Sequence, residues 1–263
     1  MFVKKTQKNI AKTAKDLIVK PIYYHFPVVD STNTTAKKCY DENKLKEGSI
    51  IYCSQQKKGK GRGNNAWFSS DNESLCFSII LEPLFLEASN YYQLHKLTSI
   101  SLIESLESFI PEKKLQIKWP NDIYFEHKKL GGILISNTIK GSTISLSIIG
   151  VGININQEKF PKELINPVSL KEICGRKYPT ENILKKIGIQ FFSNYSKLIK
   201  DLNSFDSCYQ KRLYKLNKKS RFIIKKKECT AIIRGVNEDG KILLEDAAKI
   251  NAYAMDEVKM LIV

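Results

Sequence analysis

Three glycines alternate with cationic residues in a segment that reads QKKGKGRGNNAW at residues 56–67. Glycines let a loop turn its backbone N–H groups toward an anion and let that anion come close. Lys60 and Arg62 add positive charge, and the Arg62 guanidinium can donate two hydrogen bonds to one phosphate. Trp67 offers a flat face for stacking a base or ring. The spacing matches neither the Walker A nor the Rossmann pattern. The segment is therefore either a phosphate-binding loop of another kind or a plain solvated loop.

A second candidate site combines KWPND at residues 118–122 with KLGGIL at residues 129–134. Asn121 and Asp122 supply oxygen atoms beside a turn stiffened by proline, which suits Mg²⁺ or a ribose. Lys129 could hold a carboxylate or a developing phosphoryl charge. A simple hairpin with solvated lysines has the same composition, so the residues alone leave both interpretations open.

A third segment reads GVGININ at residues 150–156. Two glycines inside an apolar strand indicate that something approaches the backbone closely. Asn154 and Asn156 are two residues apart and therefore lie on one face of the strand. An amide in a cavity can recognise the edge of an adenine, because it offers both a donor and an acceptor. A bulge at a strand end is the alternative.

Hydrophobic patterns predict the elements that must position these segments. We expect strands over residues 21–29, 49–54, 74–81, 115–119, 123–125, 132–138 and 143–152. A hairpin turn at residues 139–141 would join the last two strands. We expect helices over residues 34–43, 92–109 and 180–202, the last with an apolar face formed by Ile183, Ile187, Phe191, Tyr195 and Leu198.

The pattern changes after about residue 213, where short strands are expected at 220–224, 229–236, 241–244 and 258–262. The turn signal NEDG at residues 237–240 separates two of them. Such a run is typical of a small β-barrel. We therefore divide the chain into a basic extension at residues 1–20, a larger domain at 21–212 and a small β domain at 213–263.

Composition excludes several classes of protein. Hydrophobic residues make up 42% and charged residues 27% of the 263 residues, as in globular domains and unlike disordered or fibrous chains. No run of about 18 apolar residues is present, so we expect no transmembrane helix. The net charge is +16, carried by 38 Lys and only 5 Arg. Because the lysines are spread along the chain, coding bias explains them better than a dedicated nucleic-acid surface.

The six cysteines form no CxxC pair and match no zinc module. We expect them to be reduced, as in a cytoplasmic protein. Residues 1–20 carry six lysines and no arginine, and they lack the features of a secretory signal. A short basic helix or a frayed tail is the simplest interpretation, with an organelle transit peptide as the alternative.

Together and in this order, the segments resemble motifs of the biotin protein ligases. Residues 56–67 are similar to that family's GRGRRGRxW loop, and residues 118–122 reproduce its KWPND motif. Residues 129–134 resemble KxxGIL, residues 150–156 resemble GxGINxN, and residues 30–33 match DSTN. Residues 213–263 look like the family's C-terminal SH3-like domain. The resemblance covers residues 21–263.

The resemblance implies an α+β fold, with a mixed β-sheet, flanking helices and a small C-terminal SH3-like β-barrel. It also implies two half-reactions. Biotin attacks the α-phosphate of MgATP to give biotinyl-5′-AMP, and a lysine of a biotin carboxyl carrier domain then takes the biotin. Charge neutralisation and alignment, more than a general base, are what the first step requires. ATP, Mg²⁺ and biotin are the implied small molecules.

The resemblance also implies roles for single residues. Arg62, Lys129 and Asp122 would be catalytic, and Asp122 would also bind the metal. Biotin would contact Ser31, Thr32, Asn33, Gln56, Gly59, Lys60, Gly61, Arg62 and Lys129. The adenylate would contact Arg62, Trp67, Asn121, Lys129 and Asn154, with Trp67 stacking on adenine and Asn154 reading its edge.

The glycine loop departs from the family pattern, because Lys60 stands where Arg is usual and Gly63-Asn64-Asn65 stands where Arg-Gly-Arg is common. Only about twenty residues precede the catalytic region, too few for a winged helix-turn-helix. We therefore expect a ligase that is not a repressor, with no specific DNA binding and no membrane attachment. An acidic carrier domain suits the positive charge better. The protein would be a monomer or a homodimer, and Thr143–Ile149 is a candidate edge for pairing.

Two other functions remain open at this stage. One is a lipoate ligase or octanoyl transferase on the same fold, against which KWPND and the glycine loop argue. The other is a nucleic-acid-binding protein that uses the lysine-rich surface and the barrel. Base-reading modules usually carry several aromatic residues on one strand face. Residues 220–262 contain only Phe222 and Tyr253, which favours the ligase.

Overall fold

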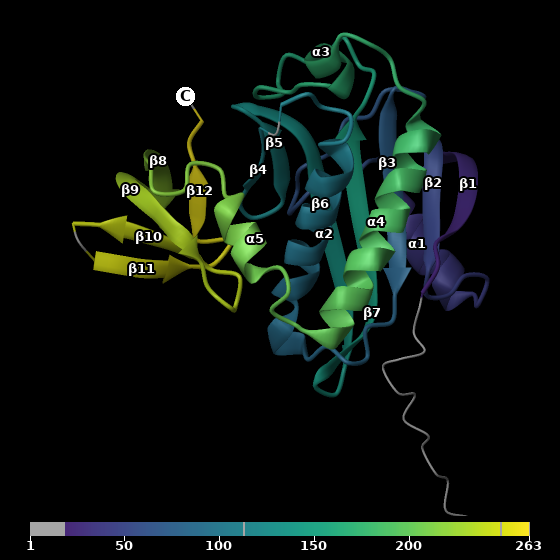
Figure 1. Cartoon of the computed structure of the whole chain (residues 1–263), viewed down its shortest axis with the longest axis horizontal. Coiled ribbons are helices and arrows are strands. Elements are labelled where there is room, and N and C mark those ends of the chain that lie inside the picture. Colours follow the sequence, from purple (N-terminus) through teal and green to yellow (C-terminus); the bar gives the residue numbers. More distant parts are fainter. Residues whose placement is uncertain (1–18, 113, 248, 263) are drawn as a thin grey trace, which may run out of the picture.

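The larger part of the chain is built on a seven-stranded sheet (Figure 1). The structure is a computed structural model, and it describes residues 19–112, 114–247 and 249–262. The strand order is β1-β2-β3-β7-β6-β5-β4. Only β1 and β2 run parallel, so the sheet is mixed, as expected. The strands are β1 (Ile22–Val29), β2 (Ser49–Gln56), β3 (Ser74–Leu81), β4 (Leu115–Lys118), β5 (Asp122–Phe125), β6 (Lys128–Lys140) and β7 (Thr143–Asn154).

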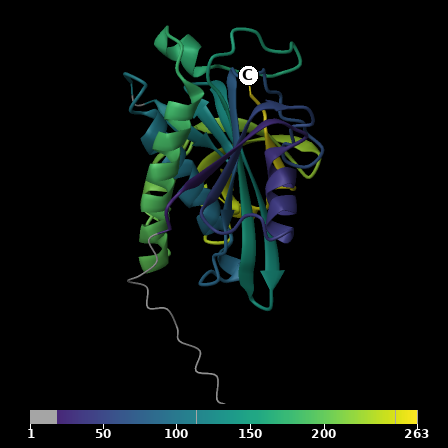
Figure 2. The ribbon, with the colours of Figure 1, turned by 90° about the vertical axis from the view of Figure 1, so that its right-hand side faces the viewer.

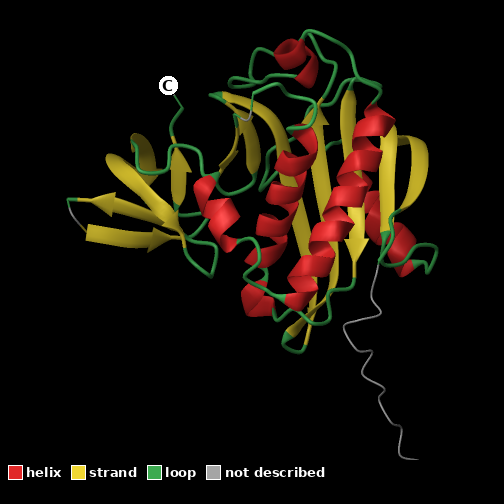
Figure 3. Cartoon of the chain, in the orientation of Figure 1, coloured by secondary structure: helices red, strands yellow, loops and turns green. Residues whose placement is uncertain are grey.

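Helices lie on both faces of this sheet. The long helices α2 (Tyr92–Leu106) and α4 (Thr180–Lys200) pack together on one face, and α1 (Thr32–Asp41) lies on the other (Figures 2 and 3). The short helices are η1 (Ala88–Asn90), α3 (Leu170–Cys174) and α5 (Asp206–Lys211). The sequence did not predict α3 or α5, because elements this short carry little periodicity.

The two long helices differ in how much of their surface is buried. In α4, the five apolar residues expected on one face are all buried. In α2, every residue except Glu104 is buried, because the sheet, α4 and α5 enclose it. A helix buried on all sides shows no clear amphipathic stripe, so its surroundings follow only from the packing.

The C-terminal part forms a second sheet of five antiparallel strands in the order β11-β10-β9-β8-β12. These are β8 (Lys219–Ile224), β9 (Lys227–Val236), β10 (Ile242–Asp246), β11 (Lys249–Tyr253) and β12 (Val258–Met260). This sheet is consistent with the expected SH3-like domain. Strand β11 was not predicted, since it is an edge strand whose five residues are all exposed or half-buried and so carry no apolar pattern. The domain boundary at residues 212–213 stays a prediction.

Two expectations about the β6–β7 hairpin are wrong. Strand β6 continues to Lys140, which pairs with Thr143, so the turn is Gly141-Ser142 and not residues 139–141. The segment Thr143–Ile149 is also not a free sheet edge. It pairs with β6 on one side, and β3 or the chain around Leu86 pairs with it on the other.

The C-terminal unit docks on the larger part through the turn between β9 and β10. The indole N–H of Trp119 donates to the Gly240 carbonyl at 2.9 Å, and this contact is buried. Gly240 has a φ of +80°, and a Cβ there would lie 2.2 Å from the Tyr92 ring. Tyr91 also donates to the Asp239 carbonyl. The turn thus fits against α2 and against the segment that precedes Asp122.

No helix in the described ranges is both long enough and apolar enough to cross a bilayer. The core joins the sheet and α2 to the C-terminal unit, with Phe222, Ile233 and Ile242 in the same buried cluster as residues of the larger sheet.

Candidate functional site

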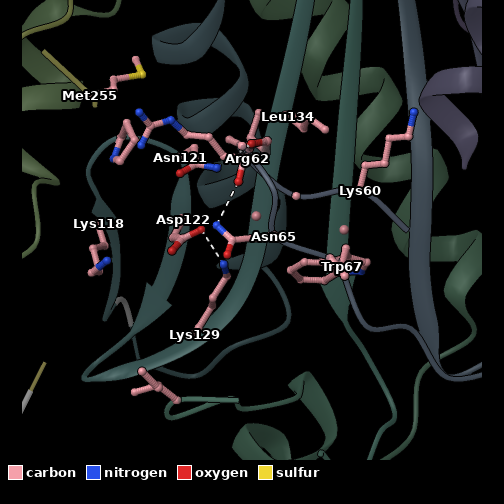
Figure 4. A pocket seen from close by; sticks show the side chains of 18 of the residues that line it. Lys60, Arg62, Asn65, Trp67, Lys118, Asn121, Asp122, Lys129, Leu134 and Met255 are labelled. Carbon is pink, nitrogen blue, oxygen red and sulfur yellow. Dashed lines mark hydrogen bonds and ion pairs between the residues drawn. The ribbon is translucent and has the colours of Figure 1, made fainter. Parts of the chain in front are cut away.

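A cavity of about 1130 Å³ lies between the larger sheet, the glycine loop and the C-terminal unit. The segments singled out in the sequence all contribute to its lining (Figure 4). Small-molecule sites usually measure about 300–1,000 Å³, so this cavity has room for two substrates side by side.

The glycine loop is closed by its own backbone hydrogen bonds. The Gly61 N–H donates to the Asn65 carbonyl at 2.7 Å, and the Trp67 N–H donates to the Gly59 carbonyl at 2.9 Å. A Cβ on Gly59 would lie 2.4 Å from the Trp67 carbonyl oxygen, so only glycine fits. The Asn65 side chain donates to the Arg62 carbonyl. The loop therefore has a defined shape that directs Arg62 toward Met255 of the C-terminal unit (Figure 4).

Trp67 lies against the two glycines of neighbouring strands. A Cβ on Gly152 would lie 2.3 Å from Trp67 Cε2, and one on Gly132 would lie 3.3 Å from Cζ3. The Lys129 ammonium is 5.6 Å from the centroid of the Trp67 ring. The close approach expected for the glycines of β7 is confirmed. Gly150 lies similarly close to Asn33, where a Cβ would be 2.2 Å from Oδ1.

Asp122 and Lys129 form an ion pair inside the cavity. Lys129 Nζ is 2.7 Å from Asp122 Oδ1, and the side chains are 32% and 14% exposed, respectively. The Lys129 backbone is held from the other side, because its N–H donates to the Asn166 carbonyl at 2.7 Å and its carbonyl accepts from Val168 at 2.9 Å. A cation and a carboxylate are thus fixed beside Trp67.

The segment at the start of α1 lies on the sheet face across the cavity. Gln56 Oε1 accepts from the Thr32 backbone N–H at 2.8 Å and from its hydroxyl at 3.2 Å. Asn33 donates to the Leu134 carbonyl, and its Oδ1 accepts from Ser78 at 2.6 Å. A polar end of the cavity is therefore lined by Thr32, Asn33, Gln56 and buried Ser31.

Residues 25–154 match the model of the Biotin/lipoate A/B protein ligase family. The chain belongs to this family.

Relatives of this biotin/lipoate ligase family member include the bifunctional ligase/repressor BirA of Bacillus subtilis, which is 31% identical over 66% of the chain and 53% of the relative. BirA of Escherichia coli is 27% identical over 89% of the chain and 72% of the relative. The chain spans about half the length of the Bacillus relatives it matches. The biotin protein ligase of Aquifex aeolicus, solved with biotin and ATP, aligns with a TM-score of 0.78 at 26% identity, covering 92% of this chain and 99% of that one.

Asn154 has a different environment in this family member from the one we expected. Its amide nitrogen donates to the carbonyls of Lys129 and Val168, at 3.3 and 3.1 Å. Its oxygen accepts from Gln157 at 3.1 Å. Both amide hydrogens are therefore engaged within the protein. In this structure Asn154 therefore holds the backbone of Lys129, and its adenine-reading role stays a prediction.

Asn121 is also tied to the sheet. Its side-chain amide donates to the Ile133 carbonyl at 2.8 Å, and its backbone carbonyl accepts from the Ile133 N–H at 2.8 Å. The side chain still borders the cavity. These contacts fix the turn that presents Asp122, next in the chain.

Lys118, the first residue of the KWPND motif, also lines the cavity, although the motif did not predict a role for it. Its ammonium lies 5.6 Å from the centroid of the Tyr124 ring. Burial lowers the pKa of Lys118, the charge of Asp122 raises it, and the charges of Lys129 and Lys259 lower it further. The alternation of β4 was the available signal, since it places Lys118 on the face opposite buried Ile117.

The C-terminal unit also lines the cavity, which no local signal indicated. Its contributions include Lys225 and Lys226 in the β8–β9 turn and Lys259 in β12. These lysines lie more than one hundred residues beyond KWPND, so only the docking of the second sheet brings them to the site.

Proposed function

We propose that the chain activates biotin with ATP and transfers it to a lysine of a biotin carboxyl carrier domain. The observation that carries the proposal is the convergence of the glycine loop, Lys129 and Asp122 on one cavity. The family match and relatives named as biotin ligases support this chemistry. A structural neighbour that holds biotin and ATP supports the two substrates.

In the first half-reaction, a carboxylate oxygen of biotin attacks the α-phosphorus of ATP. The bond from that phosphorus to the oxygen bridging to the β-phosphate breaks, and diphosphate leaves with the electron pair. Two anions must meet, so the site has to supply positive charge and alignment. Lys129 would contact the carboxylate and the α-phosphate, and Arg62 would add a second cation from the loop.

The remaining cavity residues divide between the two substrates. We assign biotin to the polar end of the cavity, which is lined by Ser31, Thr32, Asn33, Gln56, Lys60 and Gly61. Gly59, the remaining residue expected to contact biotin, does not line the cavity and shapes the loop next to Lys60. We assign the adenylate to Trp67, which carries a flat ring beside Lys129. Asn121 and Asn154 then act by positioning Asp122 and Lys129.

Mg²⁺ would accompany ATP. This ion typically binds one or two carboxylates together with phosphate oxygens and water, and Asp122 in the cavity fits that requirement. The described residues contain no group of three or more His, Cys, Asp or Glu side chains that could hold a metal ion. When bound, it would neutralise phosphate charge.

In the second half-reaction, the amine of the acceptor lysine attacks the acyl carbon of biotinyl-5′-AMP, and AMP leaves. The attacking amine must lose a proton, and Asp122, the cavity carboxylate paired with Lys129, would accept it. A carrier domain with acidic residues would complement the net charge of +16. The six free cysteines suit a reducing compartment such as the cytoplasm.

Intact mass of a purified carrier domain tests the proposal directly. We expect a biotin-sized mass gain after incubation with the protein, biotin and MgATP, and no gain when ATP is omitted. Lys129→Ala should abolish the gain. Lys128→Ala is the matched control, because Lys128 is an exposed neighbour outside the cavity.

The family includes lipoate ligases, so lipoate is run in parallel. A gain with lipoate and none with biotin would replace the proposed substrate. Biotin-dependent exchange between ATP and diphosphate without any gain would mean that the acceptor is another carrier. The absence of both gain and exchange would refute the ligase.

A further inference from the structure

We propose that Gln157 is a positioning residue for Lys129, which it holds through Asn154 and connects to the end of the glycine loop. Gln157 is fully buried and does not line the cavity, so it acts without contact to a substrate. The inference rests on the proposed function, which it deepens by naming a residue that acts on the first half-reaction from behind the site.

The backbone sets the orientation of the Gln157 amide. Gln157 Oε1 accepts a hydrogen bond from the Ile155 N–H at 2.9 Å, which an amide nitrogen could not do. Gln157 Nε2 therefore points the other way, where it donates to Ser74 Oγ at 2.6 Å and to Asn154 Oδ1 at 3.1 Å. All three contacts are buried, so both ends of this amide are engaged inside the protein.

Gln157 in turn decides which way the Asn154 amide faces. Because Asn154 Oδ1 faces the donating nitrogen of Gln157, Asn154 Nδ2 faces the carbonyls of Lys129 and Val168, at 3.3 and 3.1 Å. A flipped Asn154 would set its oxygen against two carbonyl oxygens and its nitrogen against another amide nitrogen. Such unpaired contacts are costly where water is excluded. Gln157 therefore selects the orientation of Asn154 that holds the Lys129 backbone.

The same network reaches the end of the glycine loop. Ser74 Oγ, which accepts from Gln157, also accepts from the Ser70 N–H at 2.9 Å. Ser70 follows Trp67 by three residues, and the Trp67 ring centroid lies 5.6 Å from the Lys129 ammonium. One buried network therefore supports both the segment that follows the ring assigned to the adenylate and the segment that carries Lys129.

This support has a consequence for the first half-reaction. Attack of the biotin carboxylate on the α-phosphorus requires the reacting atoms and the neutralising cation to be aligned, and a shift of about 1 Å can slow such a step about 100-fold. The polar end of the cavity and Trp67 would still bind the two substrates when Lys129 is displaced. Loss of the Gln157 contacts should therefore lower kcat more than it raises the KM values.

Biotin-dependent exchange of label between ATP and diphosphate, measured on the full chain, tests the inference. Gln157→Met keeps the length of the side chain and removes its hydrogen bonds. We expect kcat to fall about 10- to 100-fold, with the KM values for biotin and ATP changed less than about threefold. Ser74→Ala is a milder variant that removes the connection to the loop, and it should lower kcat about fivefold, as for one hydrogen bond.

Asn194→Leu is the matched control. Asn194 is also fully buried, and its amide nitrogen donates to Ser101 and Glu104 between α2 and α4. It does not line the cavity. The control should lose stability in urea unfolding, as Gln157→Met does, and keep the kcat of wild type.

Two further measurements test the route from Gln157 to Lys129. Because Gln157 acts through Asn154, Gln157→Met should cost much less kcat in an Asn154→Ala background than in wild type. Amide hydrogen exchange at residues 127–131 of the ligand-free protein should be faster in Gln157→Met and unchanged in Asn194→Leu.

A wild-type kcat in Gln157→Met, or an equal loss of kcat in Asn194→Leu, would overturn the inference. So would the same cost of Gln157→Met in both backgrounds. Should Gln157→Met yield no folded protein, an unchanged kcat in Ser74→Ala would overturn it. The absence of ATP–diphosphate exchange in wild type would refute the ligase. Faster hydrogen exchange at residues 127–131 in Gln157→Met would then still support the positioning of Lys129, whereas unchanged hydrogen exchange would overturn it.

Discussion

Two ionisable side chains, Lys129 and His95, lie in different surroundings, and only Lys129 carries a charge there. Lys129 is paired with a carboxylate at 2.7 Å and is still partly exposed, so it can exchange that partner for a substrate anion. His95 lies buried on α2, stacked on Tyr92 with ring centroids 5.2 Å apart, and its Nδ1 has no partner in the described structure. Burial, together with the charge of Arg62, lowers the pKa of His95 to about 4. His95 is therefore neutral in the folded protein at pH 7.

The low pKa of His95 predicts a pH dependence of stability. The unfolded chain has the ordinary pKa of about 6.5, so between pH 6.5 and pH 4 it binds more protons than the folded protein. The free energy of unfolding should therefore fall as the pH falls through that window, by on the order of 3 kcal/mol from this residue. Urea unfolding at pH 7.5 and pH 4 measures it.

His95→Phe keeps an aromatic ring against Tyr92 and removes the titration. Other groups titrate in both proteins, so the comparison isolates His95. We expect the variant to lose less stability on acidification than wild type. The same loss in both proteins would show that His95 does not carry this effect.

At the scale of elements, glycines let the strands support the site. Trp67 can lie against β7 only because residue 152 has no side chain, and Asn33 lies against the same strand at Gly150. Strand β7 is therefore in direct contact with Trp67 of the glycine loop and with Asn33 of α1. The chain after β7 returns past Lys129 at Val168. The Asn154 amide donates to the carbonyls of both Lys129 and Val168.

Gly152→Ala should push Trp67 from its place, since the new Cβ would lie 2.3 Å from the ring. We expect a loss of about 1–3 kcal/mol in the free energy of unfolding, as for other overpacked sites, and weaker ATP binding. The double variant with Trp67→Ala provides the decisive comparison by urea unfolding. In that background the same substitution should cost much less, whereas equal costs in both backgrounds would show that the contact with Trp67 is not the cause.

At the scale of the whole molecule, the cavity exists because two sheets dock. The β9–β10 turn fits against Tyr92 and accepts a hydrogen bond from Trp119, which lies directly before the turn that presents Asp122. Gln210 adds two hydrogen bonds to Val236, one to its carbonyl and one from its N–H. The C-terminal unit is thus attached to the same segment that carries Asp122, the proposed catalytic carboxylate.

Gly240→Ala should disturb this docking. Its cost combines the positive φ of 80° with the overlap on Tyr92. Gly175→Ala is a matched control, because Gly175 has a φ of +70° but no atom lies within 4 Å of the position that its Cβ would take. We expect Gly240→Ala to lose about 1–3 kcal/mol more than the control in urea unfolding. Hydrogen exchange should also rise at residues 237–240. Similar losses in both variants would mean that only backbone strain matters.

The sequence alone was sufficient for the larger elements and the motifs. Strand β3 and the apolar face of α4 agree with the structure, since long periodic patterns reflect one buried face. The short elements α3, α5 and β11 were missed, because a few residues contain too little pattern. The edge at Thr143–Ile149 was misassigned, since its partners come from distant parts of the chain.

What the sequence by itself determined was the family resemblance, the glycines at close contacts and the residues of the three motifs. Residue types and their spacing determine these features, because each motif consists of residues that are close together in the chain. Only the tertiary structure decided that Asn154 turns toward the Lys129 backbone and that Lys259 faces the same cavity as Lys118. Contacts of this kind, like that of Trp119 with Gly240 across 121 residues, arise when separately folded surfaces pack together, and no local pattern records them.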